Sequence, residues 1–84
     1  MTDRHALEIE RRWEAGETGC GALIVGLKRE IEQIQADELL QITAFDAGAP
    51  VDLAAWCRMT GHVLVSANHP TYVLKKRTAN PTMK

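Results

Sequence analysis

The sequence has little cysteine, no long apolar run and almost no net charge, and each shortage excludes a class of protein. Two cysteines, Cys20 and Cys57, are too few for a disulfide scaffold, so we expect free thiols in a reducing, cytoplasmic compartment. No apolar run approaches the roughly 20 residues of a membrane helix, and the N-terminus lacks the apolar stretch of a secretory signal. Ten basic and eleven acidic residues give a charge of −1, which offers neither nucleic acid nor an anionic membrane an electrostatic attraction.

Metal and phosphate motifs are also missing. Three histidines, His5, His62 and His69, and the two cysteines stand at no spacing that a zinc site uses, so we expect no metal. The glycine-rich GETGCG (16–21) lacks both the Gly-Lys-Ser/Thr ending of a phosphate loop and the GxGxxG spacing. No catalytic triad or carboxylate pair is placed by a recognisable motif. Autonomous hydrolytic chemistry is therefore not expected.

What is present is an ordinary globular composition, 45% hydrophobic and 25% charged, in 84 residues. We expect one domain over residues 1–84, with flexible ends at 1–6 and 78–84. Hydrophobic periodicity predicts six elements: strand 7–14, helix 22–35, strand 39–45, helix 48–60, strand 62–68 and strand 71–77. A short helix is an alternative for the first. The fold class is α/β (α+β): a two-layer sandwich, β-α-β-α-β-β, with both helices on one face of a four-stranded mixed sheet.

The predicted core follows from the same periodicities. The first helix is expected to bury a stripe at helical spacing, and the next strand alternates, which gives Leu23, Leu27, Ile31 and Ile34, then Leu40, Ile42 and Ala44. Asp46 is a candidate cap of the second helix, Pro50 suits its first turn, and Gly61 suits its end. In 62–68, Val63, Val65 and Ala67 are expected on one face. The lysines of 71–77 favour a sheet edge.

Cys20 would stand at the start of the first helix. Free backbone N–H groups and the positive end of the helix dipole meet there, and both favour the thiolate, which is the reactive form. Gly19 and Gly21 leave room around the sulfur. We expect sulfur-stabilising N–H groups from Gly19, Gly21, Ala22 and Leu23. The residues alone leave a second interpretation equally open, namely a turn cysteine packed under the sheet.

Two stretches resemble the TusA (SirA-like) family of small sulfur-carrier proteins. WEAGETGCGALIVGLKREIEQI (13–34) looks like the family's strand-loop-cysteine-helix segment. FDAGAPVDLAAWCRMTGHVLV (45–65) is similar to its second helix, with the pairs Asp52–Leu53 and Trp56–Cys57 and a closing Gly61–His62. The resemblance covers roughly residues 8–77 and implies a two-layer α/β sandwich.

In that family a Cys-Pro-x-Pro motif opens the first helix, and its cysteine carries sulfur as a persulfide. Cys20 takes the place of that cysteine, while Gly21 and Leu23 stand where the prolines would be. The resemblance implies a sulfurtransferase-type relay protein with Cys20 as the catalytic residue and no cofactor. Its partners would be a donor, such as a cysteine desulfurase or rhodanese-like protein, and a downstream acceptor protein. We expect Ile24 and Val25 to bind such partners, and the chain to be a monomer or weak homodimer.

Two other functions stay open. The first is a non-catalytic interaction or regulatory module that keeps the fold without the prolines. The second is a thiol redox sensor that uses Cys20 and Cys57, although Cys57 is expected in the core. The basic end formed by Lys75, Lys76 and Arg77 is a solvated strand end or a docking site for an acidic partner.

Overall fold

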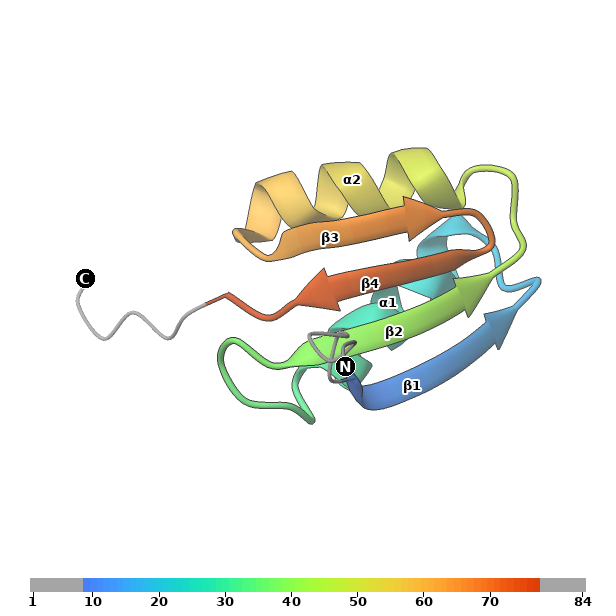
Figure 1. The fold of residues 1–84 in the computed structure, drawn as a ribbon. Helices are drawn as coiled ribbons and strands as arrows, with labels where there is room; N and C mark the ends of the chain where they lie inside the picture. The colour runs from blue at the N-terminus through green and yellow to red at the C-terminus, as the bar shows by residue number, and fades with distance from the viewer. Residues whose placement is uncertain (1–8, 78–84) are drawn as a thin grey trace.

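A computed structural model of the chain describes residues 9–77, so the ends expected to be flexible lie outside the described range. Its elements are β1 (Ile9–Gly16), α1 (Cys20–Ile31), β2 (Leu39–Ala44), α2 (Ala49–Thr60), β3 (Val63–Asn68) and β4 (Thr71–Lys75). Four strands form one layer and both helices cover its rear face (Figure 1). This order confirms the predicted fold, and the first element is a strand. Within residues 9–77, neither helix has the length and apolarity needed to cross a membrane.

The sheet has the order β1-β2-β4-β3. β1 and β2 are parallel, and β4 is antiparallel to both of its neighbours. The prediction that the last strand forms a sheet edge is therefore wrong: β4 lies inside the sheet, with Tyr72, Val73 and Leu74 buried. Its lysines are tolerated because Lys75 ends the strand and Lys76 follows it, where the side chains remain partly exposed.

The core lies between the sheet and the helices, where the predicted residues meet. The stripe Leu23, Leu27, Ile31 and Ile34 is buried with Leu40, Ile42 and Ala44, as predicted. Burial of apolar surface on this scale is the main force that holds the two layers together. α1 begins two residues earlier than expected and ends four residues earlier, yet Ile34 stays buried in the turn that follows.

A β-bulge in β3 overturns one prediction. The register shifts between Leu64 and Ser66, so Val63 pairs with Lys75 whereas Ala67 pairs with Tyr72. One extra residue in a strand reverses the faces of all that follow. Val63 and Ala67 therefore lie on opposite faces.

The ends of α2 were partly predicted. Gly61 ends the helix in the left-handed region, with φ of 90°, and its N–H donates to the carbonyl of Cys57. Asp46, however, is not the N-cap. Its carboxylate accepts a hydrogen bond from the N–H of Gly48 at 2.9 Å, and Gly48 is the residue that caps α2. Asp46 thus shapes the turn before the helix, as aspartate does in Asx-turns.

Candidate functional site at the start of helix α1

β1 and β2 are parallel, so their carboxyl ends meet at one edge of the sheet, and α1 and α2 both begin there (Figure 1). A tight turn leads from β1 into α1. Gly16 adopts a positive φ of 63°, and Thr18 donates its hydroxyl to the carbonyl of Ala15 at 2.6 Å. The backbone then reaches Cys20, the first residue of α1. The structure thus places the predicted cysteine at a helix start.

The first turn of α1 has backbone N–H groups that lack a partner within the helix. Its N-cap is Gly19, which has extended backbone and makes no side-chain cap hydrogen bond. The N–H of Leu23 donates to the carbonyl of Gly19 at 2.7 Å, so Leu23 is already paired and cannot serve as the expected sulfur donor group. The N–H groups of Cys20, Gly21 and Ala22 precede the first helical hydrogen bond and have no helical partner. No acidic residue occupies this turn, so nothing in it opposes an anion.

The backbone on either side of Cys20 is open. Apart from its chain neighbours and the backbone of α1 itself, a Cβ atom added at Gly19 or at Gly21 would meet no atom within 4 Å. Both glycines and Ala22 are exposed. A partner's backbone or a bulky sulfur donor can therefore approach this turn closely.

The two apolar residues expected to bind partners differ in exposure. Val25 has 59% of its surface exposed, whereas Ile24 is partly buried and packs against the core. Phe45, which the sequence placed inside a strand, is 54% exposed just after β2. Its N–H donates to the carbonyl of Gly16 at 2.8 Å, which ties it to the turn that precedes Cys20. The only sign in the sequence that Phe45 would be exposed was its position next to Asp46, at the predicted end of the strand.

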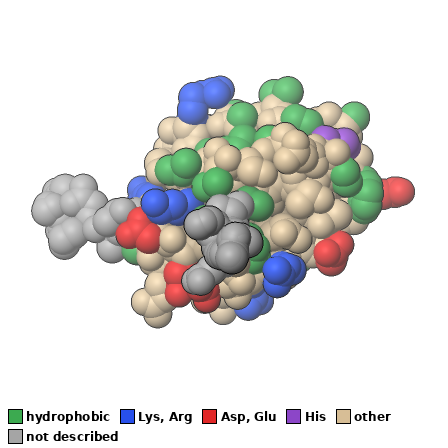
Figure 2. Space-filling view, in the orientation of Figure 1, with side chains coloured by type: hydrophobic (Ala, Val, Ile, Leu, Met, Phe, Trp, Pro, Cys, Tyr) green, Lys and Arg blue, Asp and Glu red, His purple; other side chains and the backbone are tan. Residues whose placement is uncertain are grey.

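The edge of the sheet that holds Cys20 is acidic, whereas the opposite edge carries charges of both signs. The edge that holds Cys20 carries the acidic residues Glu17, Asp46 and Asp52, and the charged side chains visible at that end of the open sheet face are red (Figure 2). Among the described residues, Arg11 and Arg12 lie in the first half of β1, and the other lysines and arginines lie at the opposite edge: Lys28, Arg29, Arg58, Lys75, Lys76 and Arg77. That edge also carries acidic residues, which are Glu30, Glu32, Asp37 and Glu38. Backbone donors, rather than neighbouring cations, are therefore the positive groups nearest Cys20.

Cys57 is a core residue, as predicted. It is buried in α2, and burial raises the pKa of its thiol to about 11. Both helices begin at the same edge, and Cys57 lies about 12 Å along α2 from that edge. The geometry therefore does not bring the two cysteines together, which removes support from the redox-sensor hypothesis.

Comparisons with known proteins identify relatives of the chain. No family model matches it. It is 43% identical over 49 residues to a Neisseria meningitidis protein named "Putative sulfur carrier protein NMA0882"; the match covers 58% of this chain and 66% of that relative. It is 42% identical over 43 residues to Bacillus subtilis "Putative sulfur carrier protein YrkF", covering 51% of this chain and 23% of the relative.

A third relative is matched over nearly its whole length. The chain is 31% identical over 69 residues to "Putative sulfur carrier protein YrkI" of Bacillus subtilis, which covers 82% of this chain and 92% of YrkI. This chain therefore belongs to the sulfur-carrier family of these relatives, as its resemblance to TusA (SirA-like) proteins predicted.

Proposed function

We propose that the chain is a cytoplasmic sulfur carrier that accepts a sulfane sulfur as a persulfide on Cys20 and passes it to a partner protein. The observation that carries the proposal is the first turn of α1: it begins at Cys20, lacks acidic residues and leaves three N–H groups without helical partners. The names of its relatives support the same role.

The transfer needs no external oxidant or reductant. The Cys20 thiolate attacks the terminal sulfur of the donor's persulfide, so a bond forms between Sγ and that sulfur while the donor's own S–S bond breaks. The donor cysteine leaves as a thiolate. In the second step, an acceptor thiolate attacks the terminal sulfur on Cys20, and Cys20 leaves as a thiolate in turn. Each exchange moves one sulfur atom and conserves electrons.

The helix start would assist both steps in the same way. The N–H groups of Cys20, Gly21 and Ala22, with the positive end of the dipole, stabilise negative charge on the sulfur before and after loading. A lower thiol pKa raises the fraction of thiolate at neutral pH. The donor and acceptor would be proteins, a cysteine desulfurase or rhodanese-like donor among them, that dock on the exposed Val25 and Phe45.

Mass spectrometry after loading tests the proposal. The reduced protein is incubated with sodium polysulfide as the sulfane-sulfur source, and each cysteine-containing peptide is then weighed. We expect a gain of about 32 Da on the Cys20 peptide, removed by dithiothreitol. The Cys57→Ala variant should load like the wild type, and Cys20→Ser should not load. Loading of Cys57 instead, or no loading of native protein, contradicts the proposal.

One observation favours a second candidate, the non-catalytic interaction module. Leu23 stands where the family has its second proline, yet it is fully buried and its N–H is paired. At this position the helix start is therefore stabilised by the packing of Leu23 in the core and not by the rigid backbone of a proline. If Cys20 does not load and its alkylation shows an ordinary thiol pKa of about 8.5, the module is the better description.

A further inference from the structure

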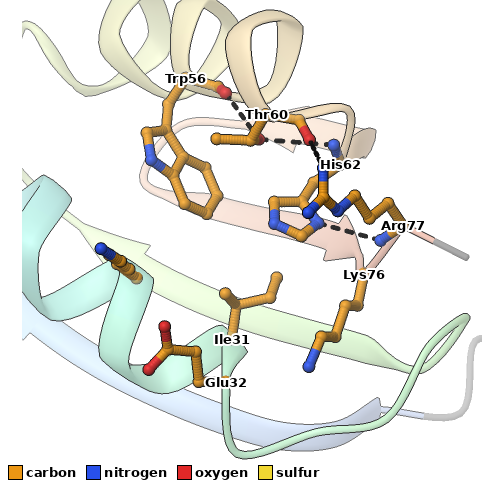
Figure 3. Close-up of a pocket in the computed structure, with 8 residues that line it drawn as sticks. Ile31, Glu32, Trp56, Thr60, His62, Lys76 and Arg77 are labelled. Carbon is orange, nitrogen blue, oxygen red and sulfur yellow. Dashed lines mark hydrogen bonds between the residues drawn. The ribbon is translucent and has the colours of Figure 1, made fainter. Parts of the chain in front are cut away.

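A pocket lies at the edge of the sheet opposite Cys20, where α1 and α2 end beside the residues that follow β4 (Figure 3). Its volume is about 400 Å³, within the range of small-molecule sites. The lining residue on α1 that is nearest to Cys20 is Lys28, about 12 Å along the helix from it. The pocket is therefore separate from the proposed sulfur site.

One wall of the pocket is apolar, and only a small part of it reaches solvent, since Trp56 is 8% and Ile31 2% exposed. Ile31 lines it from α1 and Trp56 from α2. The Trp56 ring stacks on that of His62, with centroids 5.0 Å apart and an angle of 28° between the planes. Such a wall suits the flat or apolar part of a ligand.

His62 contributes a donor to the pocket. The backbone N–H of Arg77 donates to Nδ1 of His62 at 2.9 Å, so in the neutral ring the hydrogen is on Nε2. Figure 3 shows this second ring nitrogen on the side of the pocket that faces Trp56 and Ile31. Burial first, then Arg77 and Lys76, lower the pKa of His62, which keeps the ring neutral at pH 7.

Two cations are held beside the pocket by backbone carbonyls. Nζ of Lys76 donates to the carbonyl of Ile34 at 2.7 Å, and the guanidinium of Arg77 donates to the carbonyl of Thr60 at 2.9 Å. These bonds fix the position of each head group and leave it further N–H donors. With Lys28, three cations line the pocket against one carboxylate, Glu32.

We propose that this pocket binds a small organic anion whose carboxylate or phosphate lies among Lys28, Lys76 and Arg77 and whose flat apolar part lies against Trp56. The lining supplies N–H donors and positive charge for the anion, and an aromatic wall for the rest of the ligand. The site does not depend on the sulfur chemistry, and Cys20→Ser should leave it intact.

Titrations followed by NMR of the ¹⁵N-labelled full chain test the site. The probes are phenyl phosphate and benzoate, which separate the two anion types, with benzyl alcohol as the uncharged counterpart. We expect at least one anion to shift the Trp56 indole N–H and the amides of Thr60, His62 and Arg77 saturably. Benzyl alcohol should shift them little. The absence of saturable shifts with both anions up to about 10 mM, a weak ligand's range, overturns the proposal.

Two neighbouring basic residues on α1 provide the matched pair. Lys28 lines the pocket, and Arg29 carries the same charge outside it. Lys28→Gln should raise the dissociation constant at least about threefold, and Arg29→Gln should leave it within error. If both variants weakened the binding of the anion equally, the anion would be attracted to the basic surface in general, and the proposed site would be wrong.

Discussion

The indole of Trp13 lies directly against Gly26: a Cβ atom added at Gly26 would be 2.6 Å from Cζ2 of Trp13. Real Cβ atoms do not come this close to carbon, so the absence of a side chain on α1 is what lets the Trp13 ring pack between β1 and the helix. The ring is partly buried against the core. This contact fixes the distance between the first strand and the helix that presents Cys20.

Gly26→Ala should therefore destabilise the fold. Alanine gains about 1 kcal/mol of helix propensity over glycine, but the clash with a packed ring costs about 1–3 kcal/mol. Gly21→Ala is the control, because a Cβ there meets nothing and the propensity gain acts alone. Urea unfolding should give a lower midpoint for Gly26→Ala and an unchanged or higher one for Gly21→Ala. The reverse order would show that Trp13 gives way easily.

Cys57 should resist alkylation in the native protein. In a Cys20→Ser variant it is the single thiol. Its pKa is raised from 9.0 to about 11 by burial, so at pH 8 its thiolate fraction is about 100-fold lower than in the unfolded chain. Iodoacetamide should label Cys57 at least about 100-fold more slowly in the native protein than in the protein unfolded by urea. Labelling at similar rates would show that α2 opens readily.

Stability should fall as the pH falls below about 6.5, through His62. Because the pKa of His62 is lowered in the folded state, the unfolded chain takes up the proton first. The free energy of unfolding therefore decreases as the pH falls, until the pH reaches the pKa of His62 in the folded state. The charged groups that line the same pocket as His62 are Lys28, Lys76, Arg77 and Glu32.

Replacing this ring with a group that does not titrate isolates its contribution. His62→Asn keeps an acceptor for the N–H of Arg77, so its unfolding midpoints between about pH 7.5 and 5 should vary less than those of the wild type. Parallel curves for the two proteins would assign the pH dependence to other groups.

Val25→Asp should impair sulfur delivery from a protein donor without impairing loading by polysulfide. Val25 is 59% exposed and lies five residues after Cys20, so a charge there changes the docking surface and leaves the thiol in place. Met59→Asp is the control, since Met59 is 83% exposed at the far end of α2. Equal delivery rates for the two variants, measured by transfer of radiolabelled sulfur, would place the docking surface elsewhere.

The sequence was most informative where local periodicity decides structure. The stripe on α1 and the alternation of Leu40 and Ile42 are local patterns with one buried face, so the core and element order followed from them. The place of β4 was missed because strand order depends on pairing between distant segments. The bulge after Leu64 reverses the faces of β3 without any glycine to mark it.

The candidate sites divide in the same way. Cys20 was found because glycines and a helical pattern surround it. The exposure of Phe45 depends on where β2 ends and on its bond to Gly16, and neither is visible in the sequence. The pocket at the other edge gathers Ile31, His62 and Arg77 from three separate segments, so only the folded chain brings them together.

The acidic residues at the edge of Cys20, and the excess of basic over acidic residues at the opposite edge, give the molecule an electric dipole with its negative end at Cys20. In the field of a basic partner, such a molecule rotates before contact, within about 10 Å at 0.1 M salt, so that its cysteine edge arrives first. An acidic surface would turn it the other way and present the pocket. A basic partner would thus meet the edge with Cys20 and an acidic partner the edge with the pocket, because the molecule is oriented before contact.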